Sequence, residues 1–269
     1  MASVSIPGPA NLDAGSRGVF AEPLSRRESI NWLWLVLAGF VGGYLVSEGL
    51  VLLTAAVLGR SGEVSRAASA AVPPEWFVVS SLVGLWVGFL GAPFLATRIG
   101  PVRRRLGVSV KPIDLLGIPI GIAAQIAVGI LYAPFMQHLH NFDAPIKRLT
   151  GGSHGIGLVV IVAFTAVLAP IAEEVFFRGL LFRSLLGFAV SLGERRRQVG
   201  IIGAVIADGI IFGLAHFEPV QFPGLFLVGA LLSFLFLRTG RLGMSMFAHC
   251  AFNSVALVGL ISSSGLIQP

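Results

Sequence analysis

The sequence has little charge and almost no cysteine. Only 12% of its 269 residues are Asp, Glu, Lys or Arg, whereas 55% are hydrophobic. Soluble domains carry about 25% charged residues, so this shortage excludes an ordinary soluble domain and indicates a membrane protein. The single cysteine, Cys250, excludes an intrachain disulfide and a metal cage built of several cysteines. We interpret it as a small core residue.

The chain instead contains long apolar runs. A helix needs about 20 apolar residues to cross a hydrocarbon core of about 30 Å, and the chain offers about seven runs of that length. We therefore predict an all-α fold, a polytopic transmembrane helix bundle of about seven spans, within a range of six to eight. The predicted spans are residues 32–58, 76–96, 115–136, 156–188, 201–217, 220–237 and 242–261.

One helical domain is predicted to fill most of the chain. Residues 1–30 are rich in Pro, Gly, Ser and charge, and we interpret them as a disordered tail, not a signal peptide. The transmembrane helical domain is placed at residues 31–262 and a short C-terminal tail at residues 263–269. Glycine pairs with small-xxx-small spacing predict close helix approaches at Gly39/Gly43, Gly84/Gly88 and Gly117/Gly121.

The net charge of +6 follows the predicted topology. Lys and Arg concentrate in segments that lie inside when the N-terminus is inside, above all at 103–105 and 195–197. The positive-inside rule then predicts an integral protein of the plasma or cytoplasmic membrane with a cytoplasmic N-terminus. We expect contact with membrane lipids and no nucleic-acid partner. The oligomeric state is not readable from the sequence.

Polar side chains inside the predicted spans are the candidates for function, because each is costly in a membrane unless it is paired or hydrated. Glu173 and Glu174 follow Pro170, which lacks an N–H, should bend the helix and should free a backbone carbonyl. Glu174 precedes Arg178 by four residues, the favourable order for a helical ion pair. Glu173 points about 100° away from its neighbour and is expected to remain the free carboxylate.

Two later spans also carry polar stripes. Asp208, Phe212 and His216 are spaced four apart on one helix, and His249 and Asn253 are four apart on another. Since all these stripes must avoid lipid, we expect them to face one another. With the predicted span edges, His216 lies near the outer end of its span and His249 near the inner end of its own. Convergence therefore requires the fifth span to begin further inside. Asp208 could orient the His216 stripe, act by charge on the free carboxylate, or lie too far from either.

This set of residues has the parts of a hydrolytic site. A desolvated glutamate beside a histidine can act as general base toward water, and a second histidine with an asparagine amide can donate hydrogen bonds to an oxyanion. A polar network that only locks helix packing, or a proton relay in a transporter, would use the same residue types. The sequence has no inverted repeat of the kind that secondary transporters show.

Three motifs occur in order within separate predicted spans: EEVFFR at 173–178, FGLAH at 212–216 and HCAFN at 249–253. They resemble the EExxxR, FxxxH and HxxxN boxes of the CPBP family. That family comprises CAAX-processing and bacteriocin-processing intramembrane endopeptidases, also called the Abi family. The resemblance covers about residues 110–258 and is similar only in general character over the first two spans.

The resemblance implies an intramembrane endopeptidase that hydrolyses peptide bonds of membrane-associated or lipidated peptides or proteins. Carried over motif by motif, Glu173 would activate the attacking water with help from His216. His249 and Asn253 would stabilise the oxyanion. The supporting residues would be Glu174, Arg178 and Phe212.

No cofactor is expected, since the chain contains no HExxH motif and Asn253 suits an oxyanion role better than zinc binding. The alternative is a zinc ion bound by Glu173, His216 and His249. The alternative function is a non-catalytic membrane scaffold or immunity protein with the same fold, with a transporter as a third hypothesis. The sequence does not indicate which membrane-bound peptide or protein is the substrate, or whether it is prenylated.

Overall fold

The computed structural model describes residues 24–98, 106–138, 144–150, 153 and 155–264, and this part of the chain contains helices and no strands. The all-α prediction is confirmed. The elements are α2 (Arg26–Val57), η2 (Ser61–Glu63), α3 (Val64–Ser69), α4 (Glu75–Ala96), η3 (Pro112–Leu116), α6 (Gly117–Tyr132), η4 (Ala133–His138), α7 (Ala144–Thr150), α8 (Gly155–Ala163), η5 (Phe164–Leu168), α9 (Ala169–Glu174), η6 (Val175–Phe182), α10 (Arg183–Val190), α11 (Glu194–Leu214), α12 (Phe222–Thr239) and α13 (Leu242–Ser264).

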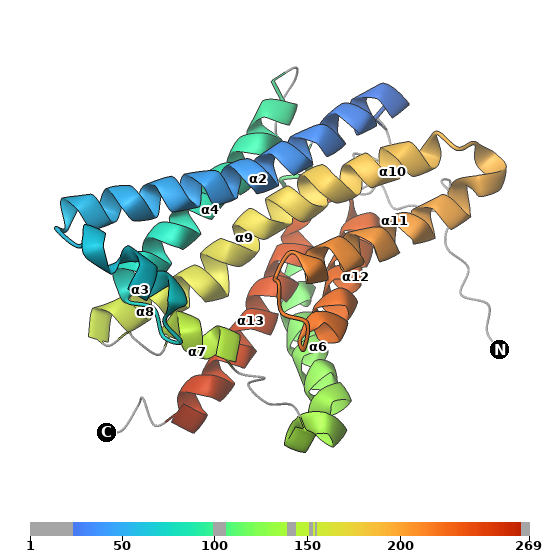
Figure 1. The fold of residues 1–269 in the computed structure, drawn as a ribbon. Helices are drawn as coiled ribbons and strands as arrows, with labels where there is room; N and C mark the ends of the chain where they lie inside the picture. The colour runs from blue at the N-terminus through green and yellow to red at the C-terminus, as the bar shows by residue number, and fades with distance from the viewer. Residues whose placement is uncertain (1–23, 99–105, 139–143, 151–152, 154, 265–269) are drawn as a thin grey trace.

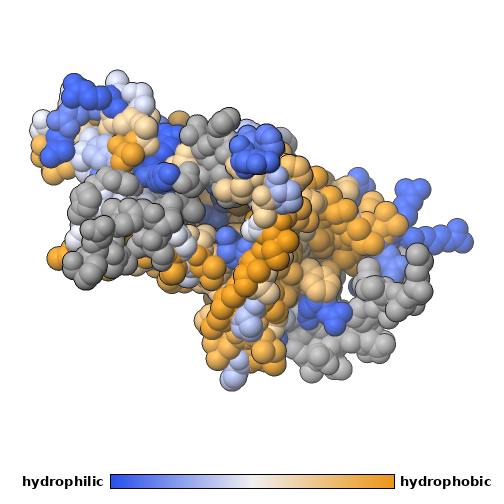
Figure 2. Space-filling view, turned by 90° about the horizontal axis from the view of Figure 1, so that it is seen from below, coloured by the Kyte–Doolittle hydropathy of each residue, from blue (hydrophilic) through white to orange (hydrophobic). Residues whose placement is uncertain are grey.

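Seven helical stretches in the described part of the chain are long and apolar enough to cross a membrane. This confirms the prediction of a seven-span bundle and of an integral membrane protein. The stretches carry exposed large apolar side chains, among them Leu45, Leu53 and Ile130, as lipid-facing surfaces require. Figure 2 shows such hydrophobic side chains covering much of one face of the molecule.

The first helix begins at Arg26, earlier than the predicted span at 32–58. Ser25 and Glu28 form a capping box: the Glu28 N–H donates to Ser25 Oγ at 3.2 Å, and the Ser25 N–H donates to the Glu28 carboxylate at 2.9 Å. This cap draws residues 26–30, which composition assigned to the tail, into α2. Residues 1–23 and 265–269 of the two predicted tails lie outside the described residues.

The fourth span is a continuous helical stretch that runs from α8 through η5, α9 and η6 to α10, and it occupies the centre of the bundle (Figure 1). We call it the central helix. It packs against α2 and α4 and also contacts α11, α12 and α13. The segments η5 and η6 are π-helical and lie before and after α9, which ends at Glu174. The carboxylate pair is thus framed by two changes of helical register.

Pro170 accounts for the first register change. In η5 the hydrogen bonds run five residues back, as from the Ala169 N–H to the Phe164 carbonyl. Pro170 has no N–H, so the carbonyl of Thr165, five residues before it, loses its helical donor. The side-chain amide of Asn253 on α13 donates to this carbonyl at 3.0 Å. The predicted freed carbonyl therefore exists, and it fixes one of the candidate site residues.

Small residues bring the helices into backbone contact, as their spacing predicted. Two of the predicted pairs, Gly39/Gly43 on α2 and Gly84/Gly88 on α4, meet where these helices cross. On α6, a Cβ added to Gly121 would meet the backbone of Ala248, the residue before His249. Helix α6 is thereby held directly against α13, the helix that carries the candidate site residues His249 and Asn253.

A buried ion pair holds the start of α6 against the turn between α12 and α13. Arg241 donates to the Asp114 carboxylate from Nε at 3.2 Å and from Nη2 at 2.7 Å, and the Lys111 N–H donates to it at 2.7 Å. Asp114 is fully buried, and Arg241 is 8% exposed. A bidentate pair of this kind fixes orientation as well as position, so α6 and α13 are aligned at this end also.

Replacing Gly121 should separate α6 from α13. We expect Gly121→Leu to lower the free energy of unfolding by about 3 kcal/mol, because the new side chain must displace the α13 backbone. Denaturant unfolding of the purified protein in detergent micelles measures this. The matched control is Gly129→Leu on the same helix, where no atom lies within 4 Å of the added Cβ. Equal stability of the two variants would contradict the contact.

Candidate active site

A buried arginine connects the polar side chains of the interior. Arg178 on the central helix donates from Nη1 to Glu174 Oε1 and from Nη2 to the Gly229 carbonyl, both at 2.9 Å. Its Nε lies 3.6 Å from Asp208 Oδ2 on α11, and its guanidinium carbon lies 4.5 Å from the centre of the Phe212 ring. One cation thus contacts two carboxylates, a carbonyl and an aromatic face. The predicted Glu174–Arg178 ion pair is confirmed.

Asp208, whose role the sequence left open, is the second counter-ion of Arg178. Its side chain is fully buried, and the Ser233 hydroxyl on α12 donates to its Oδ2 at 2.5 Å. These contacts link α11 and α12 to the central helix. Asp208 therefore contacts the site residues through Arg178. This pairing explains why a carboxylate is present two helical turns away from His216.

The two adjacent glutamates have different surroundings. Glu174 is fully buried, and its Oε1 accepts from Arg178 and from His249 Nδ1, the latter at 3.0 Å. The side chain of Glu173 is 19% exposed, and its Oε2 lies 3.7 Å from His249 Nε2. That oxygen is buried and accepts no hydrogen bond from the described residues. The helical rotation between the neighbours thus separates an ion-paired carboxylate from one that is free of such bonds.

Both candidate histidines pack against Phe212. The centre of its ring lies 4.7 Å from that of His216 and 5.6 Å from that of His249. His216 Nδ1 lies 2.7 Å from the Phe212 carbonyl; because a carbonyl only accepts, Nδ1 carries the proton and donates. The Nε2 lone pair of a neutral His216 ring therefore remains available. His249 is oriented by Glu174, which leaves its Nε2 toward Glu173.

The predicted edges of the fifth span, 201–217, were wrong at both ends. Helix α11 already begins at Glu194, because the basic run 195–197 is helical, and it ends at Leu214, before His216. Convergence of the polar stripes on the fifth and seventh spans required such an earlier start. It brings Phe212 and His216 to the level of His249, as the ring contacts show.

The turn that carries His216 is braced by the first helix. Phe217 has a φ of 55°, a left-handed conformation that bulky residues rarely adopt. Its ring centre lies 6.0 Å from that of Tyr44 and 6.4 Å from that of Phe40, both on α2. Strained backbone of this kind persists only where the surroundings hold it. Helix α2 therefore contributes to the position of His216.

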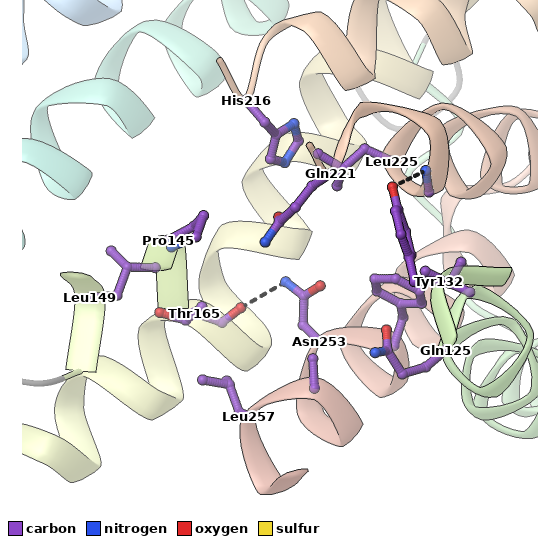
Figure 3. Close-up of a pocket in the computed structure, with 14 residues that line it drawn as sticks. Gln125, Tyr132, Pro145, Leu149, Thr165, His216, Gln221, Leu225, Asn253 and Leu257 are labelled. Carbon is purple, nitrogen blue, oxygen red and sulfur yellow. Dashed lines mark hydrogen bonds between the residues drawn. The ribbon is translucent and has the colours of Figure 1, made fainter. Parts of the chain in front are cut away.

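A cavity of about 200 Å³ opens beside His216 and Asn253 (Figure 3). Its walls come from α6, α7, η5, α12 and α13 and from the stretch between α11 and α12. Glu173 and His249 are not among its lining residues. Within the described residues, Glu173 makes its ionic contact with His249, whereas His216 bonds the Phe212 carbonyl. The predicted site residues therefore form two groups, Glu173 with His249 and His216 with Asn253, and the histidine of each group packs against Phe212.

Several polar residues that line this cavity were not predicted from the sequence: Gln125, Tyr132, Thr165 and Gln221. Gln125 offered a usable signal, because it is the only polar side chain between Gly117 and Leu131 in an apolar span. A threonine in an apolar helix carries no comparable signal, since its hydroxyl commonly bonds its own backbone.

The zinc alternative stays a prediction. Among the described residues, no group of three His, Cys, Asp or Glu side chains is arranged to hold a metal ion. Nδ1 of His216 faces the Phe212 carbonyl and Nδ1 of His249 faces Glu174, so Nε2 is the atom with which either ring would bind a metal ion. Tetrahedral zinc needs its nitrogen and oxygen donors about 2.0–2.2 Å from one shared point.

Removing Arg178 should destabilise the fold strongly. We expect Arg178→Met to lower the free energy of unfolding by about 3–5 kcal/mol, because Glu174 and Asp208 would stay buried without their cation. Chemical unfolding in micelles measures this, and Glu173→Gln is the neighbouring control that should unfold like the wild type. A stable Arg178→Met protein would show that these carboxylates do not depend on the arginine.

Comparisons with known proteins find similarity over part of the chain. Residues 155–255 match the family model described as type II CAAX prenyl endopeptidase Rce1-like. The chain is 26% identical over 99 residues to the membrane-embedded CAAX protease MroQ of Staphylococcus aureus. The aligned segment covers 37% of this chain and 38% of MroQ. The chain is 25% identical over 103 residues to YdiL of Bacillus subtilis, provisionally named a membrane peptidase, over 38% of this chain and 37% of YdiL.

The matched segments thus span little more than a third of these relatives. No solved structure gives a significant match. The family segment at 155–255 contains all three motifs, together with the central helix from α8 to α10 and most of α13. The comparisons therefore confirm the resemblance that the motifs indicated: residues 155–255 match the Rce1-like family of type II CAAX prenyl endopeptidases, and the chain is similar to membrane proteases of the CAAX type.

Proposed function

We propose that this protein is an intramembrane endopeptidase in which Glu173 activates the attacking water. The observation that carries the proposal is the difference between the two adjacent glutamates. Glu174 is fully buried, and its Oε1 is bound by Arg178 and His249, although its Oε2 accepts no hydrogen bond from the described residues. Glu173 is 19% exposed, and its Oε2 accepts no hydrogen bond from the described residues and lies beside a histidine. A general base needs such an available lone pair within reach of water.

In the proposed reaction, water donates a proton to the Glu173 carboxylate while its oxygen attacks the carbonyl carbon of the peptide bond. His216 assists by accepting a hydrogen bond at Nε2, since its Nδ1 donates to the Phe212 carbonyl. The tetrahedral intermediate then collapses. Glu173 returns the proton to the departing nitrogen, the C–N bond breaks, and the products are a carboxylate and an amine.

The oxyanion of that intermediate requires donors that are already in position. The Asn253 side-chain nitrogen carries two N–H groups, of which one is used by the Thr165 carbonyl and the other remains. We assign the second donor to His249, whose Nδ1 is held by Glu174 and whose Nε2 faces the other way. In this assignment Glu174, Arg178 and Phe212 act as positioning residues.

We propose that the reaction uses no metal ion. Glu173, His216 and His249 form no metal-binding group within the described residues, and hydrogen bonds to one shared water, about 2.7–3.0 Å long, bridge side chains that zinc, with bonds of about 2.0–2.2 Å, would have to draw closer together. The substrate belongs to the class of membrane-associated or lipidated peptides and proteins. The placement of the basic residues favours an N-terminus on the cytoplasmic side of the membrane.

The test is a comparison of protein termini in membranes from cells that carry the wild type or Glu173→Gln at matched expression. We expect new termini only with the wild type. Loss of the base should reduce cleavage by about 10²–10⁴-fold, because an amide cannot take the proton from water. Glu173→Gln should remain folded, since the side chain makes no hydrogen bond that the fold depends on.

Gln198→Met, an exposed substitution on α11, is the control for expression and membrane handling. Identical termini from cells with the wild type and with folded Glu173→Gln would reject the protease. Together with full replacement of the wild type in cells, that result would favour the scaffold function. Transport of a solute or proton by reconstituted protein, without cleavage, would favour the transporter.

A further inference from the structure

Two polar atoms in the wall of the cavity are buried without a hydrogen-bond partner in the described part of the chain. They are Gln125 Oε1 on α6 and Thr165 Oγ1 on η5. Both residues line the same cavity as His216 and Asn253. Polar atoms without partners are costly in apolar surroundings, most of all within a membrane. Two of them at one cavity point to an occupant that forms hydrogen bonds.

The rest of the cavity suits a small apolar group. In the view of Figure 3, Thr165 and Gln125 lie on either side of Asn253. The remaining lining is largely aliphatic and aromatic, with Val128, Leu149, Leu225, Phe252 and Leu257 among its members. A dry cavity of about 150 Å³ holds one benzene ring. The volume of about 200 Å³ here therefore matches a single side chain up to the size of phenylalanine.

A peptide brings the hydrogen-bond donors that these atoms lack. Every residue except proline carries a main-chain N–H, and an extended peptide inside a membrane protein must pair these groups. A glutamine side-chain oxygen and a threonine hydroxyl both accept such bonds. The amide of Asn253 lies between them and, in the proposed reaction, binds the carbonyl oxygen under attack.

Building on the proposed function, we propose that Gln125 and Thr165 bind main-chain N–H groups of the substrate while one of its apolar side chains fills the cavity. The substrate class is then an extended, uncharged peptide segment with an apolar residue next to the cleaved bond. Neither residue belongs to the three motifs, and Gln125 lies outside the family segment at 155–255. The contribution of Gln125 would thus come from this chain's third span, outside the family segment, and that of Thr165 from the fourth span.

Two near-isosteric substitutions remove the acceptors and keep the volume: Gln125→Met and Thr165→Val. Each should raise KM about 3–10-fold with little change in kcat, because it removes binding that substrate and transition state share. Thr165→Ser keeps the hydroxyl and should keep the wild-type KM. Since no partner in the described chain loses a hydrogen bond, the unfolding midpoint of Gln125→Met and Thr165→Val should equal or exceed that of the wild type.

The experiment uses the full chain in liposomes and a synthetic library of end-blocked decapeptides with randomised sequence. New termini are identified by mass spectrometry with the wild type and with Glu173→Gln. A peptide that is cut only by the wild type then serves for kcat and KM of each variant. Gln198→Met is the matched control outside the cavity, because Gln198 is exposed on α11.

We expect cut sites with an apolar residue beside the cleaved bond, raised KM for Gln125→Met and Thr165→Val, and wild-type values for Thr165→Ser and Gln198→Met. Unchanged KM in both cavity variants, or a loss confined to kcat, would overturn the binding role and leave the proposed protease intact, because cleavage would still depend on Glu173. No Glu173-dependent cleavage of any peptide would reject the proposed function and this inference with it.

Discussion

The structure depends on one buried cation, Arg178. Charges inside a membrane bundle persist only when they are paired, and Arg178 is surrounded by Glu174, Asp208, the Gly229 carbonyl and the Phe212 ring. These contacts link the central helix to α11 and α12, and the Glu174–His249 hydrogen bond extends the linkage to α13. Buried polar contacts of this kind define side-chain orientation, because each charged group is held by named partners in surroundings without water. In the proposed mechanism, Glu174 uses its contact with this network to orient His249, while Glu173 remains available to activate water.

Backbone irregularities adapt the helices to this network. The π-helical segments η5 and η6 lie on either side of the two glutamates, and Pro170 frees the Thr165 carbonyl that binds Asn253. At the end of α11, Phe217 has a left-handed conformation, and its ring contacts that of Tyr44 on α2. Departures from ideal helix geometry thus concentrate around the candidate site, which is where strain is commonly stored in proteins.

The sequence was sufficient for features that follow from local spacing and hydropathy. The seven spans, the Glu174–Arg178 pair and the glycine contacts at Gly121 were all predictable, because a helix fixes which residues share a face. Features that depend on partners far along the chain were not. The pairing of Asp208 with Arg178 needs the packing of α11 on the central helix. Hydropathy placed the start of the fifth span at residue 201, whereas α11 begins at Glu194 because the arginines at 195–197 are helical. The polar lining at Gln125 and Thr165 becomes a cavity only when α6 and η5 are brought together.

The most direct test of the account is a single turnover in water enriched in oxygen-18, with the protein in excess over a cleaved peptide. If Glu173 activates water, the new carboxylate of the product gains one heavy oxygen, and the tryptic fragment that contains Glu173 stays unlabelled. An unlabelled product, with the heavy oxygen in Glu173, would show that this side chain attacks the substrate itself. That result would contradict the central claim that the free carboxylate serves as a base.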